Sequence, residues 1–246
     1  MPGALGWFVD RHGFGLVSVI CTLSSRPRQV NHPEKVHREK GSQVRCGCIL
    51  SPVRIITGRF RGKNLVAPPG EDTRPMLGRV KENLFNILGE EIIDAAVLDL
   101  FSGSGSIGLE ALSRGAESVR FVEESKEARK ALRKNCDALS VEPGEIEHAP
   151  GDAMAADAWR KPGADRWVDV AFLDPPYPIW RAPGDRRRML SVVTAVLNEA
   201  IKPTGVLVLH TAPRDLEGPD LNLPADSKPR IYGNSALWFL RPADAP

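Results

Sequence analysis

Residues 97–112 read VLDLFSGSGSIGLEAL, an apolar stretch followed by a glycine-rich turn and the beginning of a helical pattern. The spacing Gly103-x-Gly105-x-x-Gly108 between a strand and a helix is typical of loops that bind a cofactor. Asp99 stands near the end of the strand, and the loop contains no Lys or Arg. A carboxylate beside the loop would repel a pyrophosphate, which argues against a dinucleotide. The stretch therefore predicts an α/β fold whose loop binds a cationic ligand.

S-adenosylmethionine is a ligand of this kind, because it has no phosphate and carries both an ammonium and a sulfonium group. Glu123 ends the next strand, SVRFVE, where an acid can accept hydrogen bonds from ribose hydroxyls, and Glu124 is its rival. Asp152 follows the third strand, in place to accept from an adenine amino group. The alternative is that the glycines only form a tight turn and the acids only cap helices. The cofactor-binding residues predicted at these strand ends are Asp99, Phe101, Gly103, Gly105, Glu123 and Asp152.

The rest of the chain alternates short apolar strands with helical segments. The predicted strands are AVLDLF (96–101), SVRFVE (118–123), EIEHAP (145–150), VDVAFLD (168–174) and GVLVLHT (205–211). Segment 125–139 between two of them has one apolar face and predicts a helix. This alternation predicts a parallel sheet covered on both sides, with its ligands at the carboxyl ends of the strands.

The chain divides into three predicted regions. Residues 1–52 carry seven Lys or Arg against three acids and predict a basic, disordered extension; a signal-like apolar stretch at 13–23, a transit peptide or a mis-assigned start are alternatives. Residues 53–93 predict a small cap, a hairpin followed by a helix over 78–92, and residues 94–242 form the main domain.

Composition restricts the class of protein. A hydrophobic content of 42% in 246 residues excludes global disorder, and a net charge of +2 does not by itself indicate a polyanionic partner. The four cysteines lack the spacing of a zinc site or a disulfide framework, so we expect reduced thiols, no metal and a cytoplasmic location. No stretch reaches the roughly 18 apolar residues that a membrane span needs.

Residues 171–180 read AFLDPPYPIW and end a strand in an acid, two prolines and a tyrosine. The prolines fix the loop and remove N–H donors, which leaves the Asp174 and Pro175 carbonyls as acceptors. Such a loop suits the exocyclic amine of a nucleobase, on which Tyr177 would stack. The alternative is a rigid turn with Tyr177 in the core. The predicted catalytic residues are Asp174, Pro175, Pro176 and Tyr177.

Basic residues gather in the hairpin and in WRAPGDRRR (180–188), where Trp180 accompanies them. Arginines and an aromatic side chain beside a base pocket suit single-stranded RNA, although solvated surface charge is an equal alternative for any one arginine. The predicted RNA-binding residues are Arg59, Arg61, Lys63, Arg79, Arg181, Arg186, Arg187 and Arg188.

Three stretches, TRPMLGRVKENLFNIL (73–88), LDLFSGSGSIGLEALSRGA (98–116) and DPPYP (174–178), together resemble the bacterial small-subunit (16S) ribosomal RNA guanine-N2 methyltransferases, and the resemblance spans residues 54–240. It implies a Rossmann-like class I methyltransferase sheet of seven strands, with 235–240 as the antiparallel last strand. It also implies that Asp174, Pro175 and Tyr177 engage a guanine amine, that Asp99, Gly103 and Glu123 hold S-adenosylmethionine, and that the segment from Arg74 to Lys81 packs over this donor. Met76 and Gly78 depart from the family pattern in that segment.

The expected partner is ribosomal RNA within a partly assembled small subunit, bound by a monomer without metal or membrane. Three other functions remain open. A DNA adenine N6-methyltransferase would use the same Asp-Pro-Pro-Tyr loop on a flipped base. An NAD-dependent oxidoreductase would explain the glycines but neither Asp99 nor the proline loop, and a catalytically inactive RNA-binding module would explain only the basic residues.

Overall fold

The computed structural model describes residues 53–68, 76–223 and 226–243. The predicted extension at 1–52 and the predicted cofactor contact Arg74 lie outside these ranges. The helices are α1 Gly78–Leu88, α2 Ser106–Ser113, α3 Lys126–Leu139, α4 Ala156–Trp159, α5 Pro178–Arg181 and α6 Pro183–Glu199, with 3-10 turns η1 Gly89–Ile92, η2 Pro143–Glu145 and η3 Gly218–Leu221. The strands are β1 Ala96–Leu100, β2 Ser118–Glu123, β3 Ile146–Pro150, β4 Val168–Leu173, β5 Ile201–Thr211, β6 Arg230–Tyr232 and β7 Ser235–Leu240.

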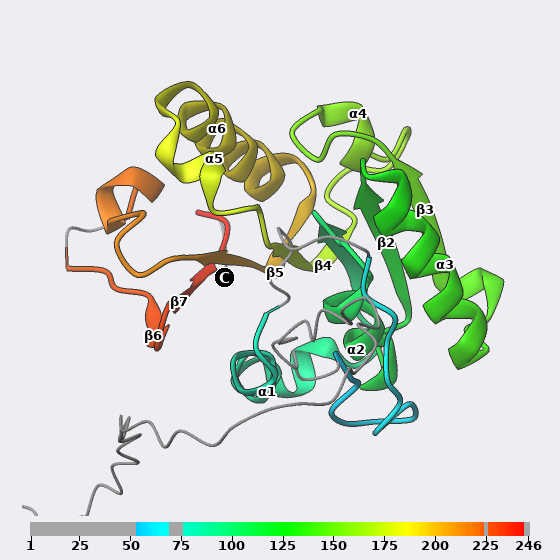
Figure 1. Cartoon of the computed structure of the whole chain (residues 1–246). Helices are drawn as coiled ribbons and strands as arrows, with labels where there is room; N and C mark the ends of the chain where they lie inside the picture. Colours follow the sequence, from blue (N-terminus) through cyan, green and yellow to red (C-terminus); the bar gives the residue numbers. More distant parts are fainter. Residues whose placement is uncertain (1–52, 69–75, 224–225, 244–246) are drawn as a thin grey trace, which may run out of the picture. The chain divides into compact units, whose positions relative to one another are not determined.

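The strands form one sheet in the order β3-β2-β1-β4-β5-β7-β6 (Figure 1). The five strands β3, β2, β1, β4 and β5 run parallel to one another, and β7 runs antiparallel to both β5 and β6. The prediction of a mostly parallel sheet closed by an antiparallel strand at 235–240 is confirmed. Strand β6 escapes sequence-based prediction because its three residues are too few to show an alternating pattern.

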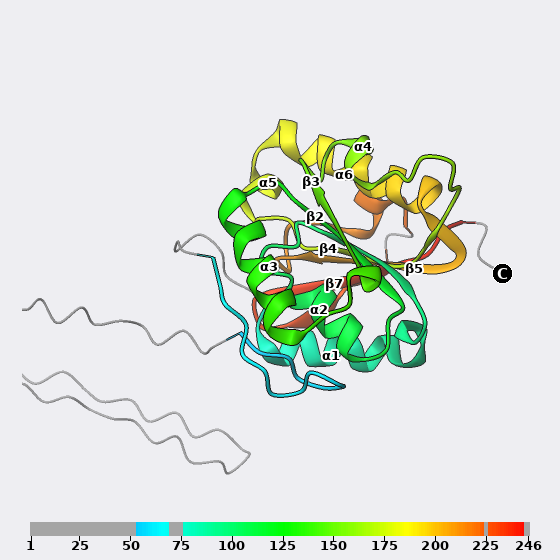
Figure 2. The ribbon, with the colours of Figure 1, turned by 90° about the vertical axis from the view of Figure 1, so that its right-hand side faces the viewer.

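Side chains of the sheet alternate between two apolar layers. In β1, Val97 belongs to the layer covered by α1, α2 and α3, whereas Leu98 and Leu100 belong to the layer covered by α4, α5 and α6. Figure 2 shows these two sets of helices on opposite sides of the sheet. Because successive residues of a strand point to opposite faces, Asp99 shares the face of Val97 and points toward α2.

Residues 53–66 fold back along α2. One antiparallel bridge, between Arg54 and Asn64, joins the two arms of this loop. The turn between the arms approaches Ser113, the last residue of α2, so closely that a Cβ on Gly58 would lie 1.6 Å from the Ser113 carbonyl oxygen. Only glycine fits there, and its φ of 85° also favours glycine.

A buried ion pair fixes the first arm of this loop to α1 and α2. Glu110 of α2 is fully buried, and its carboxylate accepts from the backbone N–H groups of Ile56 at 2.7 Å and Thr57 at 3.0 Å. Lys81 of α1 lies 3.2 Å from the same carboxylate and donates to the Ser106 hydroxyl at 3.1 Å. Burial lowers the pKa of Lys81, and the charge of Glu110 opposes that shift. The cap and the start of α2 are therefore joined through charged groups that have no contact with water.

Asn135 of α3 fixes the second arm. Its buried side-chain amide accepts from Val66 N at 2.7 Å and donates to Val66 O at 3.0 Å, as a neighbouring strand would. The same nitrogen donates to Ser104 O at 2.9 Å. Since Ser104 belongs to the glycine-rich loop, this loop is held by a helix on one side and by the cap on the other.

Candidate active site

Acidic side chains stand at the carboxyl ends of four neighbouring parallel strands. In the spatial order β3, β2, β1, β4 these residues are Asp152, Glu123, Asp99 and Asp174. The structure thus brings together four acids that the sequence scatters along the chain. We call this edge of the sheet the acidic edge.

The glycine-rich loop between β1 and α2 has an unusual backbone. Phe101 has a φ of 61°, in the left-handed region where a bulky residue is an outlier that the surrounding structure must hold in place. Gly103 has a φ of 55°, and a Cβ built on it would meet no atom of the described residues within 4 Å. The backbone at Gly103 therefore faces open space, which a bound molecule could fill.

Asp99 is 1% exposed, and its carboxylate accepts from Gly108 N at 2.9 Å. Burial raises the pKa of Asp99 to about 8; the Gly108 hydrogen bond opposes this, and the charges of Asp174 and Glu123 add to it. A Cβ on Gly108 would lie 2.4 Å from the Phe121 ring and 2.9 Å from the Asp99 carboxylate. The third glycine of the motif thus permits α2 to lie directly on the sheet above Asp99.

The raised pKa of Asp99 predicts a pH-dependent stability. The folded chain keeps this proton up to about pH 8, whereas the unfolded chain loses it near pH 4. Between these values the folded state binds more protons, so the stability contributed by protonated Asp99 falls as the pH rises. Asp99→Asn cannot ionise, so its free energy of unfolding is expected to rise relative to wild type between about pH 5 and pH 8, by on the order of 1–3 kcal/mol. Urea unfolding across this pH range measures the difference.

Glu124→Gln is the control for this experiment, because Glu124 is an exposed acid directly after the neighbouring strand β2 and its loss should leave the pH profile of stability close to that of wild type. Parallel profiles for wild type and Asp99→Asn would contradict the prediction.

The two acids at the ends of β2 and β3 are already hydrogen-bonded within the chain. Glu123 accepts from Gly103 N and from Ser125 N, both at 2.8 Å, through its two carboxylate oxygens. Asp152 pairs with Arg188 Nη2 at 2.8 Å. Each carboxylate oxygen has a second lone pair, so these contacts orient the acids without saturating them.

Asp174 comes directly after β4, and its Oδ1 lies 2.6 Å from Nδ1 of His210 on β5. The Tyr177 ring meets the His210 ring edge-on, with centroids 5.9 Å apart at 63°. No donor in the described part of the chain bonds the Asp174 or Pro175 carbonyl oxygen. Pro176 is exposed and Pro175 buried. The loop thus presents two backbone acceptors and a half-buried tyrosine at the acidic edge.

The basic residues after this loop lie at the same edge. Arg181 ends α5, and Arg186, Arg187 and Arg188 lie near the start of α6. Arg181, Arg187 and Arg188 are exposed, whereas Arg186 is half-buried and pairs with Asp220 at 2.8 Å. Trp180 is 4% exposed and packs in the apolar core, so the expectation that it accompanies the arginines on an RNA-binding surface is wrong.

The basic residues of the hairpin are not brought to the acidic edge. Arg59 pairs at 2.5 Å with Glu145, which immediately precedes β3, so it lies at the amino ends of the strands. Arg61 and Lys63 belong to the same turn. Arg79 is different: it is exposed in the first turn of α1, two residues from the Lys81 that contacts the start of α2.

His210 and Asn135 hold parts of the site that the sequence does not reveal. His210 continues the face of Val206 and Val208 along β5, but its pairing with Asp174 depends on the register between β4 and β5. Asn135 lies on the buried face of α3, whose other residues are mostly apolar. A polar residue at a core position was the available signal in both cases.

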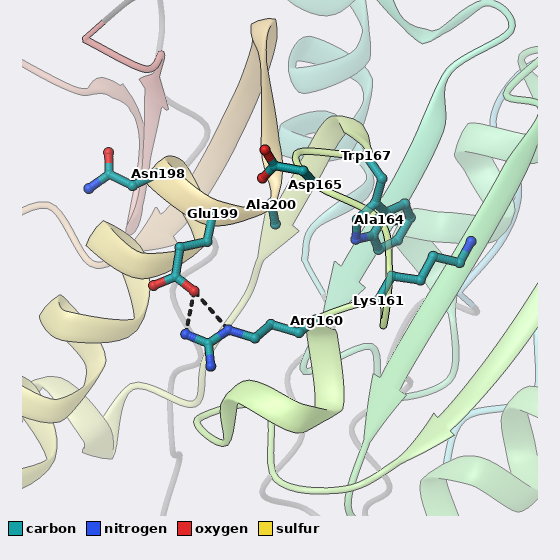
Figure 3. Close-up of a pocket in the computed structure, with 8 residues that line it drawn as sticks. All are labelled: Arg160, Lys161, Ala164, Asp165, Trp167, Asn198, Glu199 and Ala200. Atoms are coloured by element: carbon teal, nitrogen blue, oxygen red, sulfur yellow. Dashed lines mark hydrogen bonds and ion pairs between the residues drawn. The ribbon is translucent and has the colours of Figure 1, made fainter.

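A cavity of about 290 Å³ lies away from this site (Figure 3). Trp167 and Ala200, among its lining residues, immediately precede β4 and β5, so it opens at the amino ends of the strands. Its charged side chains are largely neutralised, since Arg160 bonds Glu199 and Lys161 lies 4.7 Å from the Trp167 ring. None of the acidic-edge residues lines it, and we assign it no chemistry.

Other chemistries find little support in the residues that the structure describes. Among them, no group of three or more His, Cys, Asp or Glu could hold a metal ion. Cys136 is buried, and burial raises its pKa to about 11, which makes it a poor nucleophile at neutral pH. The helices in these ranges include none long and apolar enough to cross a membrane.

Comparison with known proteins gives relatives with assigned names. Ribosomal RNA small subunit methyltransferase D of Haemophilus influenzae is 42% identical over 125 residues, which are 51% of this chain and 64% of the relative. The protein of the same name from Escherichia coli K12 is 38% identical over 125 residues, 51% of this chain and 60% of the relative. These matches span less than two thirds of either relative.

Solved structures match over a greater length. A candidate methyltransferase of Escherichia coli superposes with a TM-score of 0.61 at 29% identity, covering 77% of this chain and 98% of that one. A candidate methylase of Haemophilus influenzae gives a TM-score of 0.57 at 31% identity, covering 76% and 97%. The predicted Rossmann-like methyltransferase fold is thereby confirmed. The family described as conserved hypothetical protein 95 matches residues 53–241, which include every described helix and strand, and the chain belongs to that family.

Proposed function

We propose that the protein transfers a methyl group from S-adenosylmethionine to the exocyclic N2 amine of a guanine in small-subunit ribosomal RNA. The observation that carries this proposal is the position of the Asp174 loop. Its two backbone carbonyl oxygens, to which no described residue donates, and its carboxylate lie at the same sheet edge as the acid-lined glycine loop. The family membership and the names of the relatives support an RNA methyltransferase.

The residues of the acidic edge fit S-adenosylmethionine. When bound, this cofactor supplies an electrophilic methyl group on a sulfonium. Burial raises the pKa of Asp99, but the approach of an ammonium group would favour its ionised form, and the loop contains no Lys or Arg to compete with that ammonium. Glu123 would accept from ribose hydroxyls with its remaining lone pairs, and Asp152 from an amino group of the adenine. The open space beside Gly103 leaves room for the cofactor to contact the backbone.

The Asp174 loop would hold the acceptor amine. An exocyclic amine has two hydrogens, and the Asp174 carboxylate and the Pro175 carbonyl offer an acceptor for each. Accepting both draws the nitrogen lone pair out of conjugation with the ring and makes it a better nucleophile. Tyr177 would stack on the base, a contact worth about 1–3 kcal/mol.

The RNA would extend over the exposed arginines. Arg181, Arg187 and Arg188 follow the catalytic loop, and Arg79 lies near the start of α2. These side chains can neutralise phosphates on either side of a base that has left its stack. A partly assembled small subunit, with unpaired loops, is the form of substrate that we expect a monomer to meet in the cytoplasm.

Methyl transfer to defined nucleic acids tests the proposal. The protein is incubated with methyl-labelled S-adenosylmethionine and small-subunit ribosomal RNA, either protein-free or in partly assembled particles, from cells that lack this methylation. We expect label in N2-methylguanine at one dominant position. Label in N6-methyladenine of duplex DNA, with none in RNA guanine, would refute the proposal and favour the DNA methyltransferase.

A further inference from the structure

We infer that His210 is a positioning residue, which holds the Asp174 carboxylate in the orientation that receives the acceptor amine. The inference rests on the proposed function and extends it to a residue of β5 outside the glycine and proline loops. Three observations carry it: the contact with Asp174, the burial of the ring, and the packing of Tyr177 against it.

The contact with Asp174 fixes the hydrogen of the imidazole. An ionised carboxylate only accepts hydrogen bonds, so the nitrogen that lies 2.6 Å from Asp174 Oδ1 must donate. The hydrogen is therefore on Nδ1. Among the described residues His210 is the only side chain bonded to this carboxylate, and the contact occupies Oδ1, so Oδ2 remains for the substrate amine.

The burial of His210 destabilises the fold in a way that a purely structural role does not explain. The residue is 5% exposed, and its Nε2 is buried without a hydrogen-bond partner in the described part of the chain. A buried polar atom without a partner destabilises the folded state, and a leucine at the same place would leave no such atom. The positions before it on the same face of β5, Val206 and Val208, are apolar core. A histidine with an unpartnered nitrogen at the next position of this apolar face is unfavourable for folding, and residues of that kind are typical of functional sites.

The ring also supports the base-stacking residue. Tyr177 meets the His210 ring edge-on, an arrangement that favours one position of the tyrosine ring. One imidazole thus contacts both the group assigned to the amine and the group assigned to the base. Substitution at His210 should alter turnover through these two contacts and leave donor affinity intact, since Asp99 and Glu123 belong to other strands.

Paired substitutions separate the two contacts. Asn and Leu are similar in size, but only the amide of Asn can replace Nδ1 as a donor to Asp174; Phe keeps a ring without a donor. We expect His210→Asn to retain kcat within about tenfold of wild type, and His210→Leu and His210→Phe to lose about 10- to 100-fold, the effect of one hydrogen bond to a charged group. KM for RNA and the affinity for S-adenosylmethionine should change by less than about threefold. Equal rates for wild type and His210→Phe, or for the Asn and Leu variants, would overturn the inference.

Nuclear magnetic resonance tests the pair without any substrate. In protein labelled with nitrogen-15 at histidine, one Nδ1-bound proton should appear far downfield and should disappear in His210→Asn and in Asp174→Ala. Survival of that signal in Asp174→Ala, or its absence from wild type, would refute the pairing. If the pairing is found but no RNA is methylated, the proposed function fails and the His210–Asp174 pair stands, so the two failures are distinguishable.

Discussion

Asp174→Ala is expected to lower methyl transfer by about 100- to 1000-fold while leaving the affinity for S-adenosylmethionine within about threefold. The side chain lies after β4, beside β5, where its one hydrogen-bond partner among the described residues is His210. Among the described residues no hydrogen bond or ion pair joins this side chain to the glycine-rich loop, although its charge acts on Asp99. An acceptor that acts on the amine contributes to the transition state and little to donor binding, so the loss should fall on kcat.

Calorimetry with S-adenosylmethionine and initial rates with labelled donor measure the two quantities separately. Glu123→Gln is the matched comparison, because it removes an acid from the same edge but on the donor side, and it should weaken donor binding more than it lowers kcat. If Asp174→Ala weakens donor binding as much as it lowers turnover, the residue supports the fold of the loop and our assignment is wrong.

Glu110→Ala is expected to reduce the free energy of unfolding by about 3–5 kcal/mol, the usual cost of removing one member of a buried charged pair. The carboxylate is fully buried and is shared by Ile56 N at 2.7 Å, Thr57 N at 3.0 Å, Lys81 Nζ at 3.2 Å and Arg114 Nε at 2.9 Å. Alanine removes the acceptor of the two backbone N–H groups and of Arg114 Nε, takes the counter-charge from buried Lys81, and opens a cavity beside α2. Urea unfolding at neutral pH measures the effect.

Lys81→Met should cost less than Glu110→Ala, because the carboxylate then keeps the other three donors. Glu127→Ala, which removes an exposed acid from the first turn of α3, should change stability little. A loss below about 1 kcal/mol for Glu110→Ala would mean that water or a rearranged loop replaces the carboxylate, and that the cap is not held through this residue.

The positions of the strands and the acidic edge could be predicted from local patterns in the sequence. VDVAFLD and SVRFVE are apolar runs that end in an acid, and in a parallel sheet such ends must meet at one edge. This reasoning places Asp99, Glu123 and Asp174 together without knowledge of the register. The left-handed backbone at Phe101 could not be predicted from the sequence, because a phenylalanine rarely adopts a positive φ.

Contacts between segments that are distant in the sequence could not be predicted from local sequence patterns. The pairing of His210 with Asp174 depends on the register of β4 against β5. That register shifts between Val168 and Val170, so it could not be counted from the start of the strands. Arg59 looked like part of an RNA-binding surface because only its charge was visible; its position at the amino ends of the strands depends on how the hairpin folds along α2. The arginines around Trp180 in the sequence suggest a surface position, whereas its side chain is buried in the apolar layer that includes Met189 and Val192 of α6.

The order of the strands has a consequence for how such enzymes diversify. The residues assigned to the methyl donor, Asp99, Glu123 and Asp152, come from residues 96–152, and those assigned to the base, Asp174, Tyr177 and His210, come from residues 168–211. In the sheet these two blocks meet where β1 pairs with β4, a seam of apolar contacts such as Leu98 beside Ala171, and outside the sheet the Asp152–Arg188 pair also joins them. A genetic crossover within residues 153–167 would exchange one block and keep the other. Donor chemistry can thus be inherited as a unit while the choice of base evolves, and a chimaera that preserves the seam is the natural route to an altered target.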